Sequence, residues 1–89
     1  LLGLIREGEG KAIEILLNLN INLQDIKYHL IRFNANSLTI IIIFPEKRIE
    51  IECMSDNSFI ISVFSKYEFS IKTIDEILEE IEIMQSHNF

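Results

Sequence analysis

Acidic side chains dominate the residues of this sequence that could do chemistry. The chain of 89 residues carries 14 Asp and Glu against eight Lys and Arg, a net charge of -6. Glu50 and Glu52 alternate with apolar residues, so a strand would place both carboxylates on one face, where such a pair could transfer protons. No His or Tyr pattern accompanies them, and we interpret them as a solvated strand face that discourages edge pairing.

The single cysteine and the two histidines are the other candidates. Cys53 has no second cysteine to pair with, and it falls in the inward phase of its segment, so we interpret it as a buried structural thiol. His29 and His87 lie far apart and have no companion at metal-ligand spacing. We therefore expect no metal, no cofactor and no enzymatic activity, and we expect a reducing cytoplasm.

The segment Gly8-Glu9-Gly10-Lys11 superficially suggests a phosphate-binding loop. The Walker pattern requires glycine where Ile5 stands and Ser or Thr where Ala12 stands, and a strand should precede it. Residues 1–7 instead have the character of a helix end. The two glycines are thus predicted to mark a turn between helices.

Helical spacing predicts two further elements in the first part of the chain. One helix is expected over 11–18, and Asn20 suits the left-handed conformation at its end. A further helix is expected over 23–33, because its apolar residues repeat at intervals of three and four; they are Leu23, Ile26, Leu30 and Phe33.

Beyond a polar connector at 34–37 the apolar period changes to two, which predicts strands over 37–44, 48–54 and 58–65 and a short fourth strand over 68–71. The first strand has consecutive isoleucines at 40–43, so it should be central and covered on both faces. The third is also apolar on both faces. The N-terminal helices or a second copy of the chain, hence a homodimer, would provide the cover.

A capping box at Thr73 to Glu76 predicts the start of a final helix with one apolar and one acidic face. Together these elements predict the α+β class, with N-terminal helices, a three- or four-stranded antiparallel meander and a C-terminal helix. We expect the helical segment 1–33 and the segment 37–89 to pack together as one unit.

The charge distribution and the apolar runs exclude two classes of partner. Lys and Arg are scattered and outnumbered, which argues against nucleic acid. The longest apolar run, 40–44, is far shorter than the roughly 20 residues of a membrane-spanning helix. The chain shows no signal-peptide pattern, and its start at Leu1 within an apolar run is typical of a fragment or processed product.

Residues 1–33 resemble one half of the duplicated N-terminal domain of ClpC-type AAA+ unfoldases. In that family the domain docks substrates and adaptor proteins without catalysis, which the resemblance implies for this chain as well. The matching features are Leu2-Gly3-Leu4, Arg6, Glu7-Gly8-Glu9-Gly10, the helix from Lys11, Asn18-Leu19-Asn20 and the helix from Leu23.

The sequence departs from this family in three ways. The family's Gly-Thr-Glu-His segment would precede Leu1 and is absent, the usual turn glycine is replaced by Asn20, and residues 37–89 have no counterpart in the helical repeat. No binding residue of the family can therefore be transferred to a position in this chain.

Two hypotheses for function follow from these patterns. The first is a non-catalytic protein-interaction module that docks a client or adaptor of the Clp proteolytic machinery. The second is a small acidic inhibitor of the immunity or antitoxin type that neutralises a basic partner protein. The carboxylates expected to form the interaction surface are Glu7, Glu9, Glu50, Glu52, Glu79 and Glu80.

Overall fold

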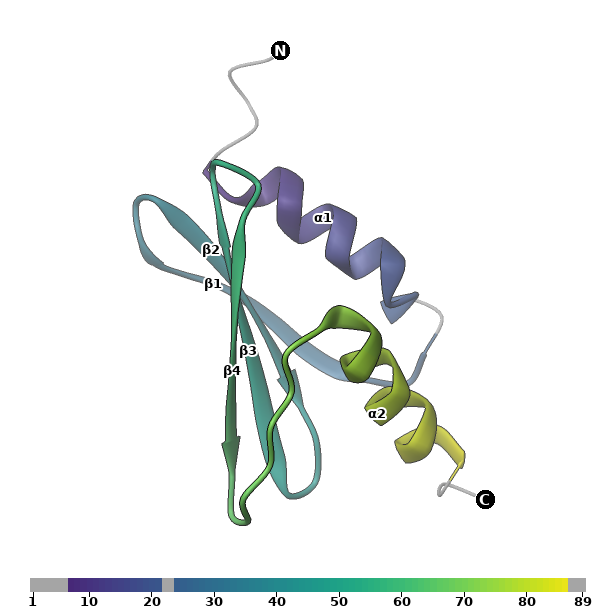
Figure 1. Ribbon diagram of the computed structural model, residues 1–89. Helices are drawn as coiled ribbons and strands as arrows, with labels where there is room; N and C mark the ends of the chain where they lie inside the picture. Colours follow the sequence, from purple (N-terminus) through teal and green to yellow (C-terminus); the bar gives the residue numbers. More distant parts are fainter. Residues whose placement is uncertain (1–6, 22–23, 87–89) are drawn as a thin grey trace.

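A four-stranded antiparallel sheet with both helices on one side forms the fold (Figure 1). The computed structural model describes residues 7–21 and 24–86. Neighbours in sequence are neighbours in the sheet, as in the predicted meander, and the α+β class is confirmed. The elements are α1 (Glu9–Asn18), β1 (Lys27–Asn34), β2 (Ser37–Ile43), β3 (Lys47–Met54), β4 (Phe59–Ser65) and α2 (Ile74–Ser86).

One core lies between the helices and the sheet face that they cover, which we call the core face. It combines residues of α1, α2 and the strands into one apolar cluster. In β3 the buried residues alternate with half-exposed carboxylates, as predicted for this strand. The fully buried side chains at the centre of the cluster are Ile15, Ile40, Ile42, Ile49, Ile51, Ile77 and Ile81.

The central position predicted for β2 is also confirmed. Ile40 and Ile42 face the helices, while Ile41 points to the opposite side and is still only 7% exposed. Ile41 lies opposite His29 on β1 and Glu50 on β3, so neighbouring strands shield it within the sheet itself. Burial on both sides of β2 therefore does not require a second layer.

The helix predicted over 23–33 is wrong, because residues 27–34 form β1 at one edge of the sheet. Residues 22–23 lie outside the described part of the chain. The apolar residues of this segment fit a helical face, yet it is also rich in β-branched and aromatic residues, including Ile31 and Phe33. Pairing with β2 decides between these options, since it satisfies the backbone along the inner side of β1.

Gly8 attaches the start of α1 to the sheet. Its φ of 83° is left-handed, and a Cβ here would lie 2.2 Å from the Cys53 carbonyl oxygen and 2.7 Å from the Leu38 nitrogen. Gly8 thus provides the predicted turn, whereas Gly10 lies inside α1 rather than between helices. The predicted helix over 1–7 falls almost entirely outside the described residues. Asn20 has a φ of 51°, as expected after the helix.

The return from β4 to α2 contains no strand, so the short strand predicted over 68–71 is wrong. Ile71 is nevertheless buried. At the start of α2 the Glu76 amide donates to Thr73 Oγ1 at 3.2 Å, which is the first bond of the predicted capping box. The Glu76 carboxylate accepts from the Lys72 amide at 3.3 Å, one residue before the cap. Within the described residues no helix has the length and apolar content to cross a membrane.

Candidate binding surface

The sheet face opposite the helices, which we call the open face, is built from three cross-strand rows. Strand register defines the rows, because residues paired across antiparallel strands point to the same side. Both described helices lie on the other side of the sheet (Figure 1). The rows are Lys27, Ile43, Arg48 and Phe64; His29, Ile41, Glu50 and Ser62; and Ile31, Thr39, Glu52 and Ile60.

Two carboxylates occupy the centre of the open face. Glu50 Oε2 lies 3.0 Å from Arg48 Nε, and Glu52 Oε2 accepts a hydrogen bond from Ser37 Oγ at 2.8 Å. Each carboxylate has two oxygens with several lone pairs, so both retain capacity for a further donor. Arg48 also lies with its guanidinium carbon 4.8 Å from the Phe64 ring centroid, so this cation contacts both Glu50 and the ring.

Exposed apolar side chains flank this acidic centre. Ile60 is 54% exposed and Phe64 48% exposed, and both belong to β4. Ile31 on β1, with a 38% exposed side chain, lies on the opposite edge of the sheet. The open face therefore combines two carboxylates and two cations, Lys27 and Arg48, with exposed apolar residues near both edges, a combination that suits a protein surface with charged and apolar groups.

The six carboxylates predicted to form one interaction surface lie in three separate places. Glu7 and Glu9 stand at the start of α1, where Arg32 donates to the Glu7 carbonyl at 2.8 Å and pairs with Glu9 at 3.6 Å. Glu50 and Glu52 lie on the open face. Glu79 and Glu80 lie on α2, on the other side of the sheet. A single flat partner could not contact all three groups.

Glu80 is engaged within the fold. Its carboxylate lies 2.7 Å from Lys47 Nζ, and both side chains are largely buried. The same ammonium group lies 5.1 Å from the Phe44 ring and 4.5 Å from the Phe69 ring. This cluster fastens α2 and the segment that follows β4 to the start of β3, so it has a structural role.

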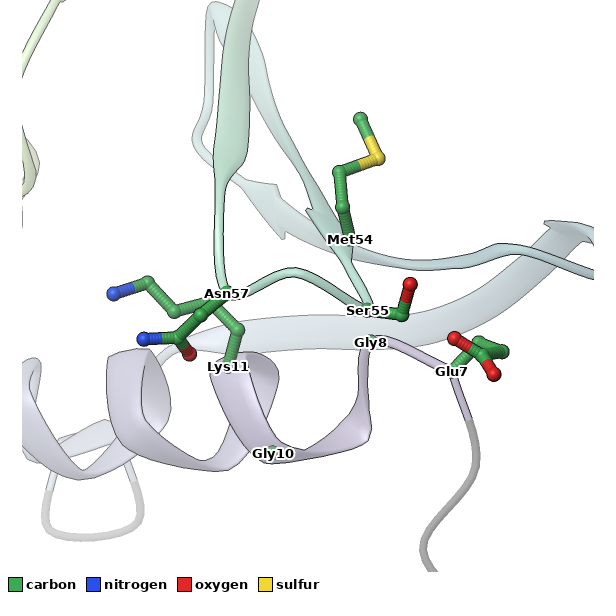
Figure 2. A pocket seen from close by; sticks show the side chains of 7 residues that line it. All are labelled: Glu7, Gly8, Gly10, Lys11, Met54, Ser55 and Asn57. Atoms are coloured by element: carbon green, nitrogen blue, oxygen red, sulfur yellow. The ribbon is translucent and has the colours of Figure 1, made fainter.

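A pocket of about 440 Å³ surrounds the glycine segment at the start of α1 (Figure 2). Figure 2 shows the side chains of Glu7 and Lys11 extending to opposite sides of Gly8. Lys11 Nζ lies 3.4 Å from Glu14 and 5.2 Å from the Phe59 ring. The lysine is thus engaged by its own helix and by β4, and the glycine segment serves to join α1 to the sheet. The lining residues are Glu7, Gly8, Gly10, Lys11, Met54, Ser55 and Asn57.

Cys53 is fully buried in the core, as its position in β3 predicts. Burial raises the pKa of its thiol to about 11, while the charge of Lys11 lowers it and that of Glu52 raises it by smaller amounts. The thiol therefore stays protonated and is a poor nucleophile near neutral pH. His29 is exposed on β1, and no three metal-ligating side chains come together among residues 7–21 and 24–86.

Comparisons with known proteins found no match for this chain. No family model, no curated protein and no solved structure matches it. The sequence alone singled out Glu50 and Glu52 but did not place His29 and Ile31 beside them, because the helix predicted over 23–33 hid the first strand. The aromatic and β-branched content of this segment is the signal that would have revealed it.

Proposed function

We propose that this chain is a non-catalytic binding module that recognises a basic protein through the open face of its sheet. The observation that carries the proposal is the pair Glu50 and Glu52 at the centre of that face, between exposed apolar residues of both sheet edges. This proposal keeps the inhibitor-type hypothesis from the sequence. It excludes the acidic residues of α2 from the binding surface, because α2 covers the core face and not the open face.

Charge supports a basic partner over other proteins. The net charge of -6 attracts a cationic surface over a distance, and the two central carboxylates would receive its Lys or Arg side chains at contact. Arg is the better match, since its planar guanidinium can bind a carboxylate through two parallel hydrogen bonds and stack on an aromatic ring. The Phe64 ring lies beside the carboxylates but is already contacted by Arg48, so a partner arginine would bind mainly through its hydrogen bonds to the carboxylates.

Apolar residues support a protein rather than a simple polycation. Ile60 and Phe64 are half exposed, and a protein interface would bury them around the polar centre. A small polyamine would leave them in water. The geometry therefore favours a folded partner whose surface combines basic and apolar side chains.

Position-specific photo-crosslinking in cells tests this proposal. A photoreactive residue replaces His29, on the β1 side of the open face, or Glu82, on the exposed side of α2. We expect one basic protein to be captured from His29 and not from Glu82. Capture of the same protein from both positions, or from Glu82 alone, would contradict the assignment of the open face.

Docking of a Clp client or adaptor is the second candidate. It is supported by the residues from Glu7 to Asn18 that resemble the unfoldase domain, a segment that includes α1. The helix that the resemblance implies for 23–33 is replaced by β1, so any such docking would use α1 alone. A photoreactive residue at Leu17, which is exposed on α1, would then capture an unfoldase or one of its adaptors.

A reducing cytoplasm is the compartment that we propose for this module. Its buried thiol at Cys53 is unpaired and needs no oxidising environment.

A further inference from the structure

The outer edge of β4 has none of the features that usually prevent strands from pairing between molecules. Within the described residues β4 pairs only with β3, and this pairing runs from Phe59 to Ser65 without a bulge. The strand contains no charged residue, no proline and no glycine. Such a strand at a sheet edge is a template for another strand.

The other edge of the sheet is protected. β1 carries Lys27 and Arg32, and its register with β2 shifts between Ile31 and Asn34. Charged side chains and bulges are the features with which proteins block edge pairing. The contrast between the two edges indicates that β4 is the edge able to pair with a further strand.

The segment after β4 does not cover this edge. Phe69 lies against Lys47, whose side chain is on the core face of β3, and Ile71 is buried. The chain therefore returns over the core face toward α2, as Figure 1 shows. Among the described residues α1 packs on β2 and β3, which leaves the β4 edge accessible from outside.

We propose that β4 pairs antiparallel with β4 of a second copy, about a two-fold axis at Ser62, to form one continuous eight-stranded sheet. This inference is independent of the proposed function. In this register Ile60 lies opposite Phe64 of the second copy and Ile61 lies opposite Val63, so like faces meet. Ser62 lies opposite its own counterpart, and within β4 no charged residue is brought face to face.

Charges beyond the strand ends do not decide the pairing. In this alignment Lys66 falls level with Ser58 of the second copy, and Asp56 falls level with Glu68. The dimer then presents two β1 strands as its outer edges, and their charges and bulges stop assembly at two copies.

Sedimentation measurements at rising concentration test the dimer. From about 1 µM to about 1 mM, the mass should rise from 10.4 kDa toward twice that value. Added salt should strengthen the dimer, because it screens the repulsion between two chains of net charge -6. Salt should weaken the binding of a basic protein. The opposite salt dependence therefore distinguishes a failure of the dimer proposal from a failure of the proposed function.

A charge on the two-fold axis should break the dimer. Ser62→Lys places two ammonium groups side by side, and we expect the dissociation constant to rise by about tenfold or more. His29→Lys adds the same type of side chain to the same face at the other edge and should leave the dimer intact. A mass of 10.4 kDa at every concentration, or equal effects of the two variants, would overturn the proposal.

Disulfide formation tests the register independently. Paired Cα atoms of antiparallel strands lie about 4.5 to 5.5 Å apart, within disulfide reach. Ser62→Cys should therefore crosslink with itself, whereas Ile60→Cys and Phe64→Cys should crosslink only when the two variants are mixed. Cys53 is buried and should not interfere. Self-crosslinking of Ile60→Cys as fast as that of Ser62→Cys would refute this register.

Discussion

The burial of a single residue in β3 depends on the face of the strand to which its side chain points. Cys53 and Glu52 are adjacent, yet the first is fully buried and the second faces solvent on the other side of β3. The alternation was visible in the sequence, so the burial of the thiol and the exposure of the carboxylates could be predicted. Their hydrogen-bond partners could not, since Ser37 lies on another strand.

Burial of Cys53 should make the stability of the protein depend on alkaline pH. The pKa is 9.0 for an ordinary thiol and about 11 in the fold, so above pH 9 the unfolded chain loses a proton that the folded chain keeps. The stability that the protonated thiol contributes is complete below pH 9 and is lost as the pH rises toward about 11. The free energy of unfolding should fall by about 1.4 kcal/mol per pH unit in that window.

Urea denaturation at several pH values, with Cys53→Ala as the matched control, measures this effect. The alanine variant is expected to be less stable throughout, because it leaves a small cavity, but it should lack the additional alkaline loss. Every other ionisable side chain is the same in the two proteins, so only the thiol differs between them. The same alkaline slope in both would show that the thiol is not the source.

Whether a segment forms a helix or a strand is decided by contacts with distant segments where its local sequence pattern fits both. α2 could be predicted in full because the capping box and the apolar face agree. β1 could not, because its apolar spacing also fits a helix and the decisive pairing with β2 joins separate segments. The full set of residues on the open face could not be predicted for the same reason, because it includes residues of β1.

The attachment of α1 to the sheet depends on one glycine of the two in the motif. Gly8→Ala would force a left-handed alanine and a clash with backbone atoms of β2 and β3, so we expect a loss of about 3 kcal/mol or more. Gly10→Ala meets no atom within 4 Å and should stabilise the helix by about 0.5 to 1 kcal/mol.

Thermal or urea unfolding of these two variants separates a structural glycine from one that has no steric role. The chemical change is identical and the positions are two residues apart, so the sign of the effect carries the information. A Gly8→Ala protein as stable as the Gly10→Ala protein would refute the close contact of α1 with β2 and β3.

The whole molecule divides its surfaces between stability and binding. The helices cover one side of the sheet and complete the core, while the other side keeps two carboxylates and exposed apolar residues in solvent. Net charge could be read from the sequence and predicts attraction to basic surfaces. The sequence does not reveal which carboxylates share a surface, because that depends on which side of the sheet the helices occupy.

The affinity of the basic protein captured from the open face is the decisive measurement for the proposed binding surface. Glu50→Gln with Glu52→Gln removes two charges from the open face, and Glu79→Gln with Glu82→Gln removes two from the exposed side of α2. We predict that the first double variant weakens binding by about tenfold or more and flattens its salt dependence, while the second changes affinity by less than about twofold. Equal losses in the two double variants would contradict the open face as the binding surface.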